Sequence, residues 1–201
     1  MIVIVDYGVG NLRSVSNMLR KVGADAKVSG DPADIRIADK VLLPGVGHFD
    51  HGMRMLRRSG LHEAIEEYAL NAGKPILGIC LGAQILGKGS EEGVEPGLGW
   101  IDMVCRRIPP APDLRVPHMG WNRVTVRRSC PLFAESGPDS RYYFAHSYFM
   151  ECTDPEDVVA TTRHGIEFTC VVQRGNVFGT QFHPEKSLRH GMAVLRAFAE
   201  L

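Results

Sequence analysis

The stretch PILGICLGAQIL, residues 75–86, decides the fold class of this 201-residue chain. Its first five residues are apolar and predict a buried strand, and the residues from 81 onward predict a helix that begins at once. Gly78 and Gly82 flank Cys80 in the G-x-nucleophile-x-G pattern of a nucleophile elbow, a strand-to-helix turn too tight for flanking side chains. Such a turn presents the thiol at the carboxyl end of a parallel sheet, where open α/β sheets bind ligands.

The residues before this stretch alternate between strand-like and helix-like segments, which predicts a parallel sheet with helices on its faces. Strands are expected over residues 2–5, 26–28, 40–43 and 75–79. Helices are expected over residues 12–22, capped by Asn11 and ended by Gly23, and from the turn at Pro44-Gly45 to about residue 72, with a break near Ser59-Gly60.

The second half reads mainly as strands, over residues 101–104, 116–126, 142–149, 158–161, 168–172 and 177–182. Arg174-Gly175-Asn176 predicts a hairpin turn between the last two, because Gly and Asn tolerate positive φ. A final amphipathic helix is expected over residues 188–199. We therefore predict a single α/β domain over residues 1–201. Its expected fold is a three-layer sandwich whose central sheet is mixed and mostly parallel, with antiparallel strands at one edge.

Composition narrows the class of function. Lys plus Arg and Asp plus Glu both number 23, so there is no electrostatic argument for binding nucleic acid or an anionic membrane surface. A net charge near zero favours association with a partner subunit. The five cysteines include no C-x-x-C pair, and the N-terminal MIVIVDYG is too short for a secretory leader. These features predict a cytoplasmic enzyme with reduced thiols.

The histidines other than His183 show no pattern of catalysis or metal binding. His118 and His146 lie in strand-like apolar contexts, which favours structural, hydrogen-bonded roles. His48, His51, His62, His164 and His190 show no metal-ligand spacing, so neither a metal nor a cofactor is expected.

A thiolate nucleophile needs a base and a group that orients the base. The segment QFHPE, residues 181–185, follows a predicted strand and supplies both in His183 and Glu185. Pro184 between them favours an extended backbone, so the two side chains can project to one side. Glu185 can then hold the tautomer of His183 while the ring faces Cys80. The sequence thus predicts a Cys-His-Glu triad.

The segment LPGVGHF, residues 43–49, is the third candidate part of the site. Two glycines after a strand can expose consecutive backbone amides, as an oxyanion hole requires. The amide of Leu81, at the start of the helix after Cys80, is placed to donate to the same oxyanion, and the helix N-terminus favours the thiolate.

Together these three segments, LPGVGHF, GICLGAQIL and QFHPEKS, resemble the class I, triad-type glutamine amidotransferases. Within that superfamily DYGVGNL (residues 6–12), PHMGWN (117–122) and YFAHSY (143–148) resemble the glutaminase subunits of imidazole glycerol phosphate synthases in histidine biosynthesis. The resemblance runs from about Ile2 to the final helix.

The resemblance implies that Cys80 attacks the carboxamide of glutamine and that ammonia passes to a barrel-shaped cyclase subunit in a heterodimer. It implies an oxyanion hole lined by Gly45, Val46 and Leu81, with a PGVG strand that reorients on activation. It implies glutamine binding by Gly47, Gln84 and the backbone around His146, Ser147 and Tyr148. It places Asn11, Trp121 and Asn122 on the side that faces the partner.

Three alternatives remain open from the residues. A paralogous branch supplies ammonia for amidino groups on surface-polysaccharide sugars, and MECTDPEDVVATTRHGIEFT, residues 150–169, resembles it equally well. A cysteine peptidase or thiol hydrolase can share the elbow on the same sandwich. A catalytically silent binding subunit is a third alternative, against which the intact triad argues.

Overall fold

The computed structural model describes residues 1–112, 114–137 and 139–201. In this part of the chain an 11-stranded sheet has the order β2-β1-β3-β4-β13-β12-β10-β6-β5, with β11 paired to β12 and β8 paired to β11. The first half contributes β1 (Ile2–Val5), β2 (Ala26–Ser29), β3 (Lys40–Gly45), β4 (Ile76–Cys80) and β5 (Gly89–Ser90). The second half contributes β6 (Met103–Arg107), β8 (Thr125–Val126), β10 (Tyr148–Cys152), β11 (Val158–His164), β12 (Ile166–Arg174) and β13 (Val177–Thr180).

The five neighbouring strands from β2 to β13 form a continuous parallel part of the sheet, and β5 pairs with β6 in parallel at the other end. Side chains of successive residues point to opposite faces of a strand, and both faces here are covered. In β1, for example, Val3 and Val5 belong to one hydrophobic cluster and Ile2 and Ile4 to the other. This two-sided burial explains why these strands are continuous apolar runs in the sequence.

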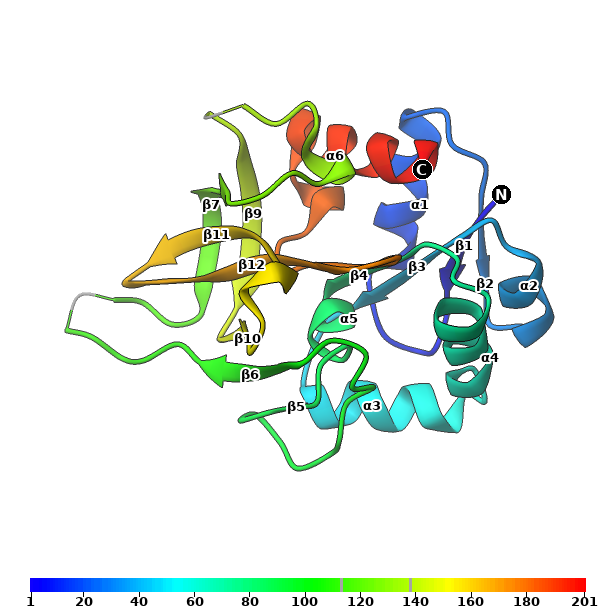
Figure 1. Ribbon diagram of the computed structural model, residues 1–201, viewed down its shortest axis with the longest axis horizontal. Coiled ribbons are helices and arrows are strands. Elements are labelled where there is room, and N and C mark those ends of the chain that lie inside the picture. Colours follow the sequence, from blue (N-terminus) through cyan, green and yellow to red (C-terminus); the bar gives the residue numbers. More distant parts are fainter. Residues whose placement is uncertain (113, 138) are drawn as a thin grey trace.

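Helices cover both faces, as Figure 1 shows, with α1 and α6 on one side of the sheet and α3, α4 and α5 on the other. The helices are α1 (Leu12–Lys21), α2 (Pro32–Ile37), α3 (Phe49–Arg58), α4 (His62–Glu66), the π-helical turn η1 (Glu67–Asn71), α5 (Leu81–Gln84) and α6 (Leu188–Glu200). Single 3-10 turns are η2 (Pro131–Phe133), η3 (Pro155–Asp157) and η4 (Pro184–Lys186). No helix of the described residues is long and apolar enough to cross a bilayer.

A second, two-stranded sheet pairs β7 (His118–Arg123) with β9 (Arg141–His146) in antiparallel register. It lies beside the antiparallel end of the large sheet (Figure 1). The backbone amide of His183 donates to the carbonyl oxygen of Tyr143 in β9, at 2.9 Å. The small sheet therefore supports the segment that follows β13.

The α/β sandwich with a mixed, mostly parallel sheet is confirmed, and so are the hairpin between β12 and β13 and the break between α3 and α4. Asn11 caps α1 through its side chain, which accepts from the amide of Ser14. The predicted strand over residues 116–126 is in fact β7 and β8, and that over residues 142–149 is β9 and β10, in two different sheets. Val124 separates β7 from β8, and a bend at Ser147 separates β9 from β10, so each half belongs to its own sheet.

Two helices differ from expectation. α2 was not predicted, although two local features favour it. Asp31 caps it by accepting from the amide of Ala33, and Pro32 stands in its first turn, where its missing N–H costs nothing. The helix expected over residues 81–86 ends at Gln84. The carbonyl oxygens of Ile85 and Leu86 instead accept from the backbone amides of a returning loop, residues 98–101, which takes them out of helical pairing.

Candidate active site

The elbow around Cys80 has the predicted form. β4 ends at Cys80 and α5 begins at Leu81, and Cys80 adopts φ 56° and ψ −110°. Positive φ is strained for a residue with a side chain, and such strain is held only where the surrounding structure fixes it. A Cβ on Gly82 would lie 1.7 Å from the carbonyl oxygen of Leu43, and one on Gly78 would lie 2.5 Å from that of Gly82. The flanking glycines are therefore required by close backbone approach.

Strand order brings the predicted base, His183, close to the predicted nucleophile, Cys80. β13 pairs with β4 in parallel register, with Thr180 opposite Ile79. On the other side of β4, Gly45 at the end of β3 lies opposite Cys80. The carboxyl ends of β3, β4 and β13, which are neighbours in the sheet, thus carry in that order the candidates for the oxyanion hole, Cys80, and the QFHPE segment. The segments are far apart in the chain, and only the parallel pairing unites them.

The three residues predicted to form the triad, Cys80, His183 and Glu185, are all buried and lie together. Nδ1 of His183 lies 2.9 Å from Oε1 of Glu185, and neither side chain is more than 3% exposed. Burial opposes the charge on His183, but the hydrogen bonds that its ring donates to Cys80 and Glu185 outweigh burial and raise the pKa of His183 to about 9. Among the described residues, Oε2 of Glu185 has no hydrogen-bond partner. The geometry therefore favours a protonated imidazole between an acid and a sulfur.

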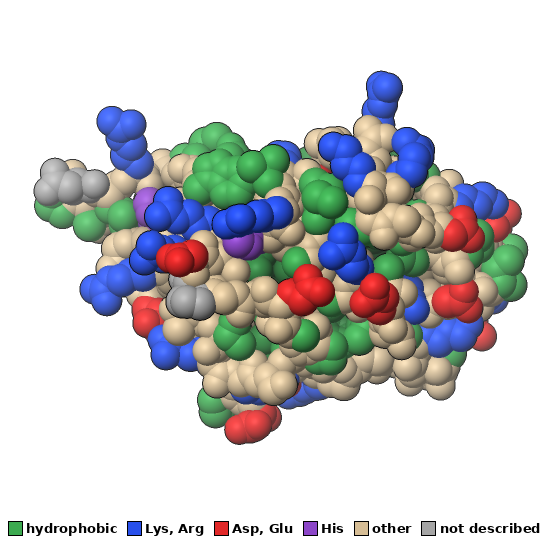
Figure 2. Space-filling model, turned by 90° about the horizontal axis from the view of Figure 1, so that it is seen from above, with side chains coloured by type: hydrophobic (Ala, Val, Ile, Leu, Met, Phe, Trp, Pro, Cys, Tyr) green, Lys and Arg blue, Asp and Glu red, His purple; other side chains and the backbone are tan. Residues whose placement is uncertain are grey.

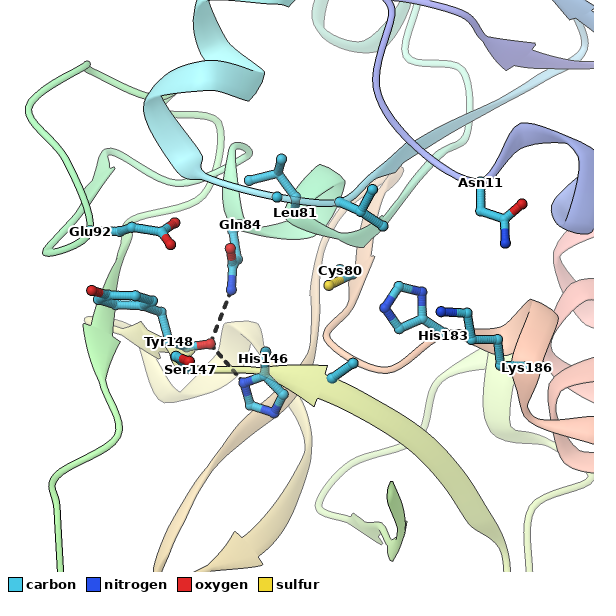
Figure 3. A pocket seen from close by; sticks show the side chains of 13 residues that line it. Asn11, Cys80, Leu81, Gln84, Glu92, His146, Ser147, Tyr148, His183 and Lys186 are labelled. Atoms are coloured by element: carbon cyan, nitrogen blue, oxygen red, sulfur yellow. Dashed lines mark hydrogen bonds between the residues drawn. The ribbon is translucent and has the colours of Figure 1, made fainter. Parts of the chain in front are cut away.

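A cavity of about 410 Å³ opens onto Cys80. Figure 3 shows Cys80 between Gln84 and His183 on its wall. Nine of the residues predicted for catalysis, the oxyanion hole or glutamine binding line it: Val46, Gly47, Cys80, Leu81, Gln84, His146, Ser147, Tyr148 and His183. Gly45 and Glu185 do not line it. Gly45 lies in register with Cys80, and Glu185 lies behind His183.

The cavity also contains residues that the sequence reading did not assign. Glu92 and Lys186 line it, and Glu92 accepts a hydrogen bond from the backbone amide of Phe49 at 2.8 Å. Lys186 follows Glu185 in the segment QFHPEKS, so its position close to His183 in the sequence could have predicted its place at the cavity. Glu92 stands in the loop after β5 with no motif around it, and only the return of that loop brings it to the cavity.

The expected structural histidines form a hydrogen-bonded pair in which His146 lines the cavity and His118 does not. Nδ1 of His146 lies 2.8 Å from the carbonyl oxygen of Tyr148, and its Nε2 lies 3.1 Å from Nδ1 of His118. A carbonyl oxygen only accepts, so Nδ1 of His146 carries the proton, its Nε2 accepts, and Nδ1 of His118 donates. Burial lowers the pKa of His146 to about 3 and that of His118 to about 4, so both rings are neutral near pH 7.

The residues predicted to face a partner divide into three cases. Trp121 is 46% exposed and lines a surface hollow of about 650 Å³ with Leu188 and Arg189, among others. The side chain of Asn122 is held inside the chain, because its amide nitrogen lies 3.1 Å from Nε2 of His118 and 2.9 Å from the carbonyl oxygen of Arg163. Asn11 lines the active-site cavity as well as capping α1.

Similarity to known proteins extends over the whole chain. Residues 3–200 match the family described as Glutamine amidotransferase class-I. Imidazole glycerol phosphate synthase subunit HisH 2 of Pseudomonas aeruginosa is 52% identical over 201 residues, which cover 100% of both chains. Imidazole glycerol phosphate synthase subunit HisH of Bdellovibrio bacteriovorus is 43% identical, with 100% of both chains covered.

Solved structures support the same fold. A crystal structure described as that of a glutamine amidotransferase superposes with a TM-score of 0.75 at 21% identity, covering 100% of this chain and 98% of the other. Identity this low is evidence for the fold alone, whereas the family match and the relatives above 40% identity are evidence for membership of the family. The chain belongs to the class I glutamine amidotransferases.

Proposed function

We propose that this chain is the glutaminase subunit of an imidazole glycerol phosphate synthase. The observation that carries the chemistry is Cys80, held at the strained end of β4 beside a His183 that Glu185 orients. The full-length relatives at 52% and 43% identity, both named as subunits of that synthase, support the pathway. The comparisons give no support to the sugar-amidination branch.

Catalysis begins with attack of the Cys80 sulfur on the carboxamide carbon of glutamine. The C–N bond breaks, and His183 gives its proton to the departing ammonia, which leaves a γ-glutamyl thioester on Cys80. Water, deprotonated by His183, then attacks the thioester and releases glutamate and the thiol. Glutamine and one water become glutamate and one ammonia.

The groups around the cavity have complementary tasks. The backbone amides of Val46 and Leu81, which line the cavity, and of Gly45, in register with Cys80, are the candidates to stabilise the negative charge of the tetrahedral intermediate. The carboxylate of Glu92 is suited to the α-ammonium group of an amino acid. Gln84, Ser147 and Tyr148 bound the remaining wall for the body of glutamine.

Ammonia passes from this site to a barrel-shaped cyclase subunit bound as a heterodimer in the cytoplasm. Figure 2 shows hydrophobic side chains gathered in a patch bordered by Lys and Arg side chains on the surface. Trp121 and Leu188, which are 46% and 66% exposed, are the hydrophobic residues best suited to contact with the cyclase subunit. The side chain of Asn122 is hydrogen-bonded to His118 and to the carbonyl oxygen of Arg163 in its own chain, so it affects the partner only through these residues.

Glutamate release by the purified chain, alone and with a histidine-pathway cyclase and its ribonucleotide ligand, tests the chemistry. We expect release that rises when the cyclase and its ligand are present and that a Cys80→Ala variant abolishes. Full turnover in Cys80→Ala would overturn the nucleophile. Hydrolysis of peptides without release of glutamate would favour the thiol hydrolase alternative, and partner binding without ammonia would favour a silent subunit.

Growth of a bacterial strain that lacks its own glutaminase subunit and requires histidine tests the pathway. We expect the wild-type chain to restore growth without histidine at low ammonium, and the Cys80→Ala variant to fail at the same expression level. Glutamate release in vitro without rescue and without cyclase binding would favour the sugar-amidination branch.

A further inference from the structure

Two buried glutamines lie beside Cys80, one of them on the cavity wall and one behind it. Gln84, in α5, is 5% exposed, and Gln181, directly after β13, is 0% exposed. Buried amides need hydrogen-bond partners, and each partner fixes which end of the amide faces which way. Gln181 does not line the cavity, so contact with glutamine does not account for its burial here.

The carbonyl oxygen of Tyr148 determines the orientation of both amides. It lies 3.0 Å from the Gln84 amide, and because it can only accept, the atom of Gln84 that faces it is the nitrogen Nε2 (Figure 3). The same Nε2 lies 3.1 Å from the Gln181 amide, whose facing atom must therefore be the acceptor Oε1. The opposite end of Gln181, its Nε2, then lies 3.8 Å from the sulfur of Cys80.

We propose that Gln181 donates its side-chain N–H to the sulfur of Cys80 and stabilises the thiolate, with Gln84 and the Tyr148 carbonyl holding the amide in that orientation. A donor to an anionic acceptor makes a stronger bond than a donor to a neutral one, so the contact favours the reactive form of the thiol. The sulfur is then stabilised by His183 and by Gln181. The role in turnover rests on the proposed glutaminase function, whereas the effect on the thiol does not.

The other groups that act on this sulfur are unchanged by a substitution at position 181. They are His183, which Glu185 orients, and the buried Tyr7 and Cys105, each of which interacts electrostatically with Cys80. Tyr7 and Cys105 both have a pKa raised well above the ordinary value, chiefly by burial, and are neutral at pH 7. Loss of the amide donor can therefore be measured against a constant background.

The test is the rate of alkylation of Cys80 by iodoacetamide, followed by mass spectrometry of the peptide that contains it, in the wild type and in Gln181→Met. Methionine keeps the length of the side chain and removes the donor. We expect the rate at pH 7 to fall about tenfold, the equivalent of one hydrogen bond to a charged group. At pH 10, above the ordinary pKa of a cysteine thiol, the two rates should converge. Gln173→Met, the same change in β12, should match the wild type at both pH values.

Equal rates for the wild type and Gln181→Met at pH 7 would overturn the proposal. A tenfold deficit that persists at pH 10 would also overturn it, because a distorted pocket slows alkylation at every pH. The alkylation rates are measured without glutamine. They therefore test the effect of Gln181 on the thiol separately from the proposed glutaminase function, which glutamate release by the wild type tests.

A second variant guards against misfolding of Gln181→Met. Gln181→Glu keeps the acceptor for Gln84 and replaces the donor by a carboxylate oxygen, which repels a thiolate. We expect a larger deficit at pH 7 than in Gln181→Met, again with a smaller difference at pH 10. A Gln181→Glu protein that alkylates as fast as the wild type at pH 7 would contradict the inference.

Discussion

Nδ1 of His183 lies 2.9 Å from Oε1 of Glu185, and both side chains are buried at the end of β13. The carboxylate fixes the tautomer that leaves Nε2 of His183 free for the sulfur and the leaving group. It also supports a positive charge on the ring, the form that protonates ammonia in the proposed mechanism. The pair is therefore the part of the triad whose charge can be tested separately from the nucleophile.

Replacing Glu185 by Gln should lower kcat for glutamine hydrolysis about a hundredfold or more and change KM little. The amide keeps the size of the side chain but removes the charge that stabilises the imidazolium. Steady-state glutamate release measures both constants. Glu151→Gln, which removes an exposed carboxylate paired with Arg106, should leave them unchanged. A Glu185→Gln enzyme with wild-type kcat would show that the carboxylate is dispensable.

The raised pKa of His183 predicts a loss of stability in alkali. The pKa rises from 6.5 to about 9 on folding, so the protonated ring stabilises the folded state fully below pH 6.5 and loses that effect as pH rises through 9. The full change is roughly 3 kcal/mol. Urea unfolding at pH 6 and pH 9.5 should show the wild type losing this much more than His183→Gln. Parallel losses in the two proteins would contradict the shift.

The pair His118 and His146 predicts a loss of stability in acid. Burial lowers the pKa values to about 4 and about 3, so between pH 6.5 and pH 4 the unfolded chain binds more protons than the folded one. The free energy of unfolding must then decrease as the pH is lowered. The decrease is several kcal/mol in total, on the order of 1.4 kcal/mol for each pKa unit. Urea unfolding at pH 7 and pH 4.5 measures it. The double variant His118→Gln, His146→Gln should lose less than the wild type, and the exposed control His51→Gln should lose as much as the wild type.

Substituting Gly82 by Ala should destabilise the protein by about 3 kcal/mol or more, since a Cβ there would overlap the Leu43 carbonyl oxygen and force β3 away from the elbow. The free energy of unfolding in urea checks this. At Gly89 a Cβ would meet no atom within 4 Å, so Gly89→Ala should change stability little. If both variants were equally stable, close approach would not be the reason for the glycine.

The elbow, the hairpin at Gly175 and the helix after Asn11 were predictable because each depends on a few neighbouring residues. α2 was missed although its signals are local too, since six residues with one buried side chain, Ile35, give little periodicity. The site was predictable where it lies in motifs. Glu92 was not, because a loop with no pattern reaches the cavity only in the folded chain.

By itself the sequence was enough to predict the chemistry, because Cys80, His183 and Glu185 stand in short segments whose local geometry the neighbouring glycines and Pro184 restrict. The tertiary structure decided which groups act on the sulfur and how they are oriented. Tyr148, Gln84 and Gln181 come from β10, α5 and the end of β13, and only their meeting lets one carbonyl oxygen, which can accept but not donate, set the direction of two amides that end at Cys80.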